Sequence, residues 1–410
     1  MTQQAEKAEP GAVTAAQGAG GGAGTAAGRA GARLPDMTYT EQETELRAAV
    51  RSVLDEKAQA AAVLARTETT QTYDGALWRT LAAEVGCAGL LIPETYGGAG
   101  ASFREAAVVA EEIGRSVAPV PFIGSAVLAT VALLRLGDAE LLTKLAAGTT
   151  TAALAVPFES VPGQRPAGSV RVGPSRAHDL AGSNRLSGTV SGVADALPAD
   201  VLIVAADGVP FGLYVVAADA TGVTRTPVVS LDMTRQLCDI TLTDVKARRL
   251  AGGMAAEEAL ADALRAGAGM LAAEQLGLAE RALDITLAYV KQRYQFARPV
   301  GSFQALKHRF ADWWVAVTQA RAASRYAAAC LASDDPDVEV AVALAKAVCS
   351  EVAVLAGQEM IQLHGGIGFT WEHPAHLYLT RAKSSALALG TADRHRASLA
   401  GLVNLPPPPR

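Results

Sequence analysis

Two short segments carry the residue types best suited to contact a ligand. One runs from Gln362 to Thr370 and reads QLHGGIGFT, and the other runs from Arg293 to Gln304 and reads RYQFARPVGSFQ. Both lie in a region dominated by Ala, Leu and Val, where a helical glycine costs roughly 1 kcal/mol relative to alanine. A glycine cluster in such a region indicates a sharp turn or a close approach of the backbone to another group.

Helical elements must position both segments. Apolar residues recur at helical spacing in four ranges, 257–295, 303–332, 336–364 and 374–389. An earlier helical region runs from Met37 to about Gly148, and Thr40 is a good N-cap for its first helix. Between the two helical regions, short runs at 201–205, 213–216 and 238–243 predict strands.

This order predicts an α+β protein with an N-terminal helical domain, a middle β-sandwich or barrel domain and a C-terminal four-helix bundle. The expected boundaries are 1–36 for a disordered tail, 37–148 for the helical domain, 149–250 for the β domain, 251–403 for the bundle and 404–410 for a Pro-rich tail. The first tail has almost no large apolar side chain, so burial cannot offset its ordering entropy.

Composition excludes several classes of function. The 410 residues are 19% charged with a net charge of -5, which argues against nucleic acid as a partner. Prolines interrupt the uncharged stretch 116–134, so we expect no membrane span. The four cysteines are far apart, which predicts buried thiols in a reducing cytoplasm. We predict no metal site, because the histidines lack companions at ligand spacing and should be surface or hydrogen-bonded residues (His308, His364, His373 and His376).

The domain order, together with the spacing of RxxF, FQ and QxxGG, resembles the acyl-CoA dehydrogenase family over residues 37–402. That resemblance implies FAD as cofactor and oxidation of an acyl-CoA thioester to its 2,3-enoyl form. In such enzymes these segments contact FAD held chiefly by a neighbouring subunit. The resemblance therefore implies a homo- or hetero-oligomer, a dimer or tetramer, that shares FAD, and it allows an electron-transfer protein as a further partner.

The residue types suit that cofactor. The guanidinium of Arg293 offers several donors to the FAD pyrophosphate, and Gln295 and Gln304 can bind polar edges of the cofactor. Phe296 and Phe303 offer flat apolar surfaces. The cofactor-binding residues that the resemblance implies are Arg293, Gln295, Phe296, Phe303, Gln304, Gln362, Gly365, Gly366 and Thr391.

The catalytic base of the family is missing from both of its usual positions. The reaction needs a carboxylate within hydrogen-bond reach of the α-proton of the thioester. One position, before a Gly-Thr pair, holds Leu389, and the other, on an earlier helix, holds Gly267. Asp262 and Glu274 lie near the second position, but a shift in register would be needed to place either of them. The catalytic residue is therefore unknown.

The segment expected to face the flavin ring also departs from the family. The stretch that corresponds to a Gly-x-Lys-x-aromatic-Ile-Thr motif has Val190, Gly192 and Ala194 in place of Lys, the aromatic residue and Thr. The preceding loop, 155–160, matches the Thr-Glu-Pro-like pattern of the family only weakly. The base and the surface facing the ring are thus missing together.

Three interpretations follow. The first is an acyl-CoA dehydrogenase subunit that does not catalyse and that supports FAD bound by a heteromeric partner, with a bulky CoA thioester such as a steroid side chain as substrate. The second is a stand-alone acyl-CoA dehydrogenase with a displaced base. The third is a non-enzymatic scaffold that binds acyl-CoA or protein, although retention of RxxF, FQ and QxxGG argues against it.

Overall fold

The computed structural model describes residues 36–166, 170–173 and 183–406, and all of them belong to one compact unit. Apart from residue 36 and residues 404–406, the two predicted tails lie outside the described residues.

The N-terminal helices begin at caps that the sequence encodes. Thr40 caps α1 as predicted: its side chain accepts a hydrogen bond from the Glu43 backbone N–H (3.1 Å), and the Glu43 carboxylate accepts one from the Thr40 N–H (2.7 Å). Ser102 and Glu105 make the same reciprocal cap on α4. The elements of this part are α1 (Glu41–Lys57), α2 (Ala60–Thr67), α3 (Gly75–Arg79), η1 (Thr80–Glu84), η2 (Glu94–Tyr96), α4 (Phe103–Ser116), η3 (Phe122–Ala129), α5 (Thr130–Leu136) and α6 (Ala139–Ala146).

The middle part is a seven-stranded sheet in the order β1-β4-β5-β7-β3-β2, with β6 paired to β7. The β1–β4 pair is parallel and the other pairs are antiparallel. The register of β3 against β7 shifts between Val190 and Val193, which is the kind of irregularity that redirects side chains near functional sites. The strands are β1 (Ala152–Ala155), β2 (Val170–Gly173), β3 (Ser183–Ala194), β4 (Val201–Ala206), β5 (Gly212–Ala217), β6 (Val223–Pro227) and β7 (Leu237–Gly252).

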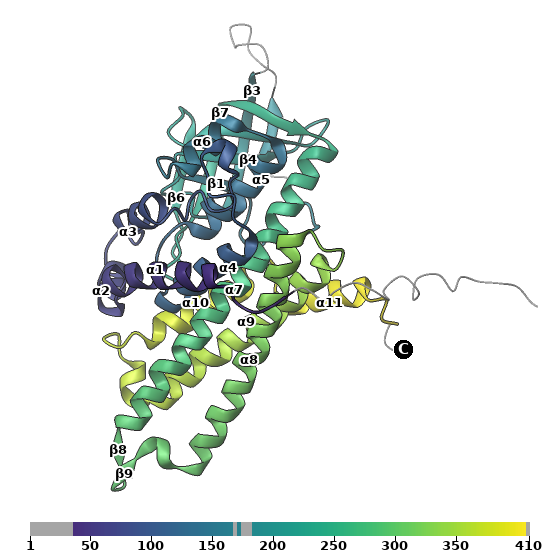
Figure 1. Ribbon diagram of the computed structural model, residues 1–410. Helices are drawn as coiled ribbons and strands as arrows, with labels where there is room; N and C mark the ends of the chain where they lie inside the picture. The colour runs from purple at the N-terminus through teal and green to yellow at the C-terminus, as the bar shows by residue number, and fades with distance from the viewer. Residues whose placement is uncertain (1–35, 167–169, 174–182, 407–410) are drawn as a thin grey trace, which may run out of the picture. The chain divides into compact units, whose positions relative to one another are not determined.

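Long helices form the C-terminal part, and a short hairpin links the first two at one end of the bundle (Figure 1). Gly114 and Gly277 allow α4 and α7 to cross closely, since a Cβ on either glycine would overlap a backbone carbonyl of the other helix. The elements are α7 (Met254–Gln292), β8 (Tyr294–Gln295), β9 (Arg298–Pro299), η4 (Val300–Ser302), α8 (Gln304–Ser333), α9 (Val338–His364), η5 (Gly365–Phe369), α10 (Ala375–Leu387) and α11 (Ala392–Leu402).

The predicted α+β class, with an N-terminal helical part, a middle β part and a C-terminal helical bundle, is confirmed, and the middle part is a curled sheet. Among the described residues, the stretch 338–369 is long and apolar enough to cross a bilayer, but 67% of its most apolar window is buried, as in a bundle core. All four cysteines are buried and free. Within the part of the chain described, no group of three or more His, Cys, Asp or Glu residues could hold a metal ion.

Candidate functional site

The two predicted binding segments meet at one end of the C-terminal bundle. The Tyr289 ring, on the last turn of α7, stacks on the ring of His364, the last residue of α9, with 4.4 Å between centroids. The backbone N–H of Arg293 donates to the Tyr289 carbonyl at 2.9 Å, and Gln304 begins α8 directly after the hairpin. Segments about seventy residues apart are thus joined through one ring contact.

Several groups at this bundle end are open to a ligand or partner. Arg293 is exposed and makes no ion pair or side-chain hydrogen bond among the described residues. Phe296 is 85% exposed, and its ring meets Phe303 edge-on at 6.2 Å. Arg298 covers the Phe303 ring, with its guanidinium carbon 3.9 Å from the centroid. The side chain of Gln295 is exposed on the same hairpin.

The glycine cluster also faces open space. Gly365 has a φ of +63°, a conformation that L side chains rarely adopt, so the turn after α9 favours glycine there. A Cβ built on Gly365 or Gly366 would meet nothing within 4 Å, and Gln362 is exposed beside them. Among the described residues, no atom lies against the backbone at these two glycines, so it is open to a ligand or a partner.

Thr391 lies apart from the other predicted residues. It caps α11, accepting a hydrogen bond from the Arg394 N–H at 3.4 Å, and follows Leu389 and Gly390. The Lys346 ammonium on α9 donates to the Gly390 carbonyl at 3.2 Å. Eighteen residues of α9 separate Lys346 from His364, or about 27 Å at 1.5 Å per residue. The predicted binding residues therefore form two groups on this chain.

Both usual positions of the catalytic base converge on one spot, and leucine fills it. A Cβ built on Gly267 would lie 3.1 Å from Leu389 Cδ1 and would overlap Leu128 Cδ2, which is closer than van der Waals contact allows. Leu389 is 0% exposed and Leu128 is 3% exposed. Neither leucine can accept a proton, and neither leaves room for a carboxylate.

The turn that carries Leu389 is fixed on every side. Its N–H donates to the Phe158 carbonyl at 2.7 Å, and its carbonyl accepts from His395 Nε2 at 2.8 Å. Lys346 bonds the next carbonyl, that of Gly390. Leu389 has a φ of +53°, which costs roughly 1–2 kcal/mol for an L residue. Burial of its side chain contributes about 1.5–3 kcal/mol and offsets that strain.

The polar groups around the turn cannot replace the base. Burial lowers the pKa of His395 to about 4, so its ring is neutral, and the Leu389 carbonyl occupies its Nε2–H. Burial also lowers the pKa of Lys346 to about 7 in a site with no carboxylate partner. Its ammonium bonds the Ser385 carbonyl (2.9 Å) and the Ser350 hydroxyl (3.0 Å) as well as Gly390.

The two nearby acids are committed to ion pairs. Glu274 is buried between Arg235 (2.5 Å) and Arg381 (2.8 Å). Burial alone would raise the pKa of Glu274, but the two guanidinium groups outweigh it and lower that pKa to about 2. Asp262 pairs with Arg135 and, at 2.7 Å, with Arg265. Neither carboxylate serves as a base at the leucine-filled spot.

A cavity of about 450 Å³ lies where the sheet meets α10, lined in part by Phe158, Gly192, Lys383 and Leu387. Gly192 has a φ of +64°, and a Cβ there would meet nothing within 4 Å. The cavity therefore has a glycine where the resemblance implies an aromatic ring. Val190 and Ala194, the other two substituted positions, are 4% exposed in the sheet.

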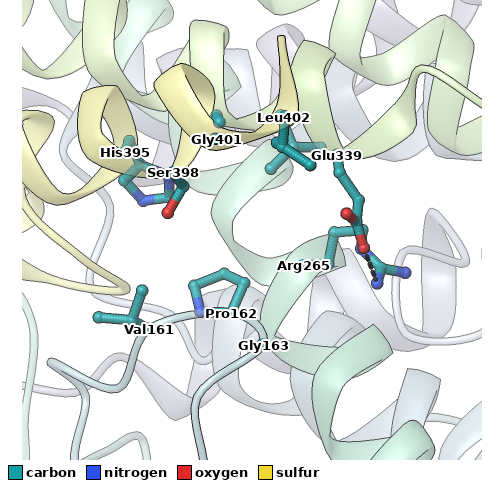
Figure 2. A pocket seen from close by; sticks show the side chains of 11 residues that line it. Val161, Pro162, Gly163, Arg265, Glu339, His395, Ser398, Gly401 and Leu402 are labelled. Carbon is teal, nitrogen blue, oxygen red and sulfur yellow. Dashed lines mark hydrogen bonds and ion pairs between the residues drawn. The ribbon is translucent and has the colours of Figure 1, made fainter. Parts of the chain in front are cut away.

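A second cavity, of about 340 Å³, lies between the loop 161–163 and helices α7, α9 and α11 (Figure 2). Its one carboxylate, Glu339, is paired with Arg265 at 2.9 Å, as the dashed line in Figure 2 marks. His395 and Ser398 face it from α11 in the same view. The residues lining this cavity are mainly apolar, and they include no unpaired acid.

FAD fits the bundle end better than the sheet cavity. The hairpin and the segment after α9 offer a free guanidinium, amides, aromatic faces and open glycine backbone, which suit a nucleotide and its phosphates. The sheet cavity is lined by Phe158, Glu159, Lys383, serine hydroxyls and apolar side chains. It has Gly192 in place of the aromatic residue that the resemblance implies for a flavin ring, and the described residues that line it include no threonine.

Sequence reasoning missed the residues that close the site. Leu128, Phe158, Lys346 and His395 come from four elements, and no motif links them. Only Lys346 carries a signal, because it is a lone charge within the apolar run AVALAKAVCS. A charge in such a run predicts a buried residue with a specific partner.

Comparison with known proteins agrees with this architecture. The models of the N-terminal and C-terminal acyl-CoA dehydrogenase domains match residues 40–151 and 241–402. Acyl-CoA dehydrogenase IpdE2 of Mycobacterium tuberculosis is 37% identical over 355 residues, which cover 86% of this chain and 94% of the relative.

Two solved structures resemble the chain closely. The steroid acyl-CoA dehydrogenase variant named Tcur3481–Tcur3483 matches with a TM-score of 0.76 and 32% identity over 89% of this chain and 98% of its own. The ChsE4–ChsE5 complex of Mycobacterium tuberculosis matches with a TM-score of 0.79 and 28% identity over 91% and 100%. The chain therefore belongs to the acyl-CoA dehydrogenase family, whose members are FAD-dependent oxidoreductases that act on CH–CH donors.

Proposed function

We propose that this chain is the subunit without a catalytic base in a heteromeric acyl-CoA dehydrogenase. Its hairpin and QxxGG segment bind the nucleotide half of an FAD whose flavin ring lies in a related partner subunit. The partner supplies the carboxylate that removes the α-proton. Bound FAD supplies the hydride acceptor for the β-carbon.

The observation that carries this proposal is the filled spot at Gly267 and Leu389. A base on either element would reach the same place, and that place holds the side chains of Leu128 and Leu389. The Leu389 N–H is bonded to the Phe158 carbonyl and is not free to bind a ligand. The side chains described at this spot are leucines, which cannot take the α-proton of a thioester.

The open bundle end supports the division of one FAD between two chains. Arg293, Phe296 and Gln362 face away from their own chain, about 27 Å along α9 from the turn at Leu389. Because this group of residues lies so far from the turn at Leu389, it is suited to bind the nucleotide half of a cofactor whose flavin ring lies in a neighbouring subunit. We propose Arg293, Gln295, Phe296, Phe303, Gln304, Gln362, Gly365 and Gly366 as this nucleotide site, with Thr391 at the separate ring-side position.

The relatives narrow the partner and the substrate. ChsE4–ChsE5 and Tcur3481–Tcur3483 are each named as two chains, and the second is named a steroid enzyme. By analogy we propose a related but non-identical partner subunit in a dimer or tetramer, and a bulky CoA thioester such as a steroid side chain. We also propose a cytoplasmic location and an electron-transfer protein as acceptor.

Flavin content tests the proposal. The chain is purified alone and after co-expression with an acyl-CoA dehydrogenase homologue encoded beside it, and visible flavin absorbance per chain is measured. We expect little flavin in the chain alone and stoichiometric flavin in the complex. Flavin and acyl-CoA turnover in the chain alone would instead support a stand-alone enzyme with a displaced base. Absence of flavin from both preparations would leave the scaffold interpretation.

A further inference from the structure

A continuous stack of rings joins the two segments at the bundle end. Tyr289 on α7 stacks on His364 of α9 at 4.4 Å, and His364 meets His373, which precedes α10, at 4.4 Å. Trp371, in the loop before α10, meets His376 in the first turn of α10 edge-on at 4.7 Å. The stack thus connects the end of α7, which leads into the Arg293 hairpin, with both sides of the glycine segment.

Backbone partners fix the orientation and the tautomer of each imidazole. His364 Nδ1–H donates to the Met360 carbonyl at 2.7 Å, and His376 Nδ1–H donates to the His373 carbonyl at 2.9 Å. His373 Nδ1 instead accepts from the Ala375 N–H at 3.2 Å. Protonation of His373 would place a hydrogen on Nδ1, which already accepts the Ala375 N–H. Protonation of His376 would place a hydrogen on its buried Nε2, which has no hydrogen-bond partner among the described residues.

The electrostatic surroundings also disfavour charge on the stack. Burial lowers the pKa of His364, His373 and His376, and the two neighbouring histidines lower that of His373 further. The carboxylates nearest in sequence are not paired with these imidazoles. Glu359 on α9 forms an ion pair with Arg309 of α8 at 2.7 Å, and Glu372 is exposed to solvent. The other polar rings that face His364 and His373 are the phenol of Tyr289 on α7 and the imidazole of His376 on α10.

We propose that Tyr289, His364 and His373 form a positioning clamp that holds the hairpin and the glycine segment in one arrangement, and that the clamp requires uncharged imidazoles. These residues touch neither substrate nor reacting atoms. They fix the backbone that presents Arg293 and Gly365 to the nucleotide. The functional consequence rests on the proposed function: loss of the clamp would release FAD and the partner subunit.

Amide hydrogen exchange of the full chain tests the clamp directly. In Tyr289→Ala, which alters only α7, exchange across residues 362–371 should rise about three- to tenfold, the range expected for loss of an aromatic pair. Tyr289→Phe keeps the stacking ring and loses only the long 3.4 Å hydrogen bond from the Tyr289 hydroxyl to the His364 carbonyl, so its exchange should stay much closer to that of wild type than the exchange of Tyr289→Ala. Far-UV circular dichroism establishes that each variant is folded. Wild-type exchange at 362–371 in the folded Ala variant would overturn the clamp.

Acidification tests the requirement for neutral rings without a variant. Between about pH 7.5 and about pH 5.5, on either side of the ordinary histidine pKa, wild-type exchange at 362–371 should rise after correction for the intrinsic rate. His373→Gln cannot gain charge there and should respond less. A wild-type response that is absent, or equal to that of His373→Gln, would overturn this part of the proposal.

Flavin retention in the co-expressed complex separates the clamp from the proposed function. Release of FAD by Tyr289→Ala, with retention by Tyr289→Phe, supports both. Faster exchange with full FAD retention supports the clamp and refutes the cofactor role of the bundle end. Unchanged exchange refutes the clamp whatever the flavin content.

Discussion

Replacing Leu389 by glutamate recreates the residue type of the missing base at its usual position. We nevertheless expect the Leu389→Glu variant to lose stability and to gain no acyl-CoA dehydrogenase activity. The space beside residue 389 is filled by the Leu128 side chain, and the neighbouring Gly267 has no side chain that could pair with a carboxylate. The backbone N–H of residue 389 already donates to the Phe158 carbonyl.

The magnitude follows from burial. Loss of the buried leucine side chain costs about 1.5–3 kcal/mol, and Leu389→Gln should show this loss without adding a charge. A buried carboxyl has its pKa raised by as much as 3–5 units, which at about pH 8 adds roughly 4–5 kcal/mol for glutamate. Because the pKa is raised in the folded state, this extra cost is present at alkaline pH and disappears as the pH falls toward 4.3.

Urea unfolding followed by circular dichroism measures these differences at about pH 8 and at about pH 5. Leu389→Met, which keeps the volume, should lose less than about 1.5 kcal/mol and serves as the packing control. Turnover is assayed as reduction of an artificial electron acceptor by acyl-CoA in the presence of FAD. A glutamate variant as stable as the glutamine variant at pH 8 would show that the spot is polar, for instance through pairing with Lys346. Turnover by the glutamate variant or by the wild-type chain alone would refute the closed site.

Three further predictions concern the cofactor and the buried charges. Arg293→Ala should weaken the affinity of the complex for FAD by roughly 10- to 100-fold, the effect expected for loss of a charge-assisted hydrogen bond. Lys291→Ala, which removes an exposed charge nearby, should leave FAD retention unchanged. Equal retention by the two variants would show that Arg293 does not bind FAD. Burial raises the pKa of Asp195 to about 6 against the pull of Arg235, so Asp195→Asn should stabilise the chain by up to about 3 kcal/mol at pH 8. That gain should vanish in urea melts below about pH 4, and a gain independent of pH would contradict the assignment. Glu274→Gln leaves two buried arginines without their carboxylate and should cost about 3–5 kcal/mol, so an unchanged urea midpoint would disprove the ion network.

Much of the fold could be predicted because its signals are local. The Thr40 cap and the four helical ranges after residue 250 depend on residues within a few positions of one another, and the observed helices begin and end within a few residues of the predicted ones. Strand β3 was not predicted, because its sequence SNRLSGTVSGVA is rich in Ser and Gly and is extended through pairing with β7. Residues 122–129, within the uncharged stretch 116–134, form the π-helical η3, whose Gly124 N–H is bonded to Asp195.

The sequence predicts residue types for a candidate site but not the geometry that brings them together. RxxF, FQ and QxxGG indicated the nucleotide segments, yet the stack of Tyr289 on His364 that joins them depends on how α7 packs against α9. The histidines were expected to be hydrogen-bonded or at the surface. His364 and His376 do bond backbone carbonyls, but their stacking with His373 has no signature in sequence spacing.

The convergence of Gly267 and Leu389 changes what the missing base means. In the sequence they are two separate losses, 122 positions apart, and a base displaced to the other element remained an alternative. In the fold they are one place, and Leu128 occupies what either carboxylate would need. Restoring a base would therefore require a new acid, removal of a leucine from another helix and release of the Phe158 contact. A spot that needs three coordinated changes before it could hold a base is part of the core of the chain, which supports our proposal that a partner subunit supplies the base.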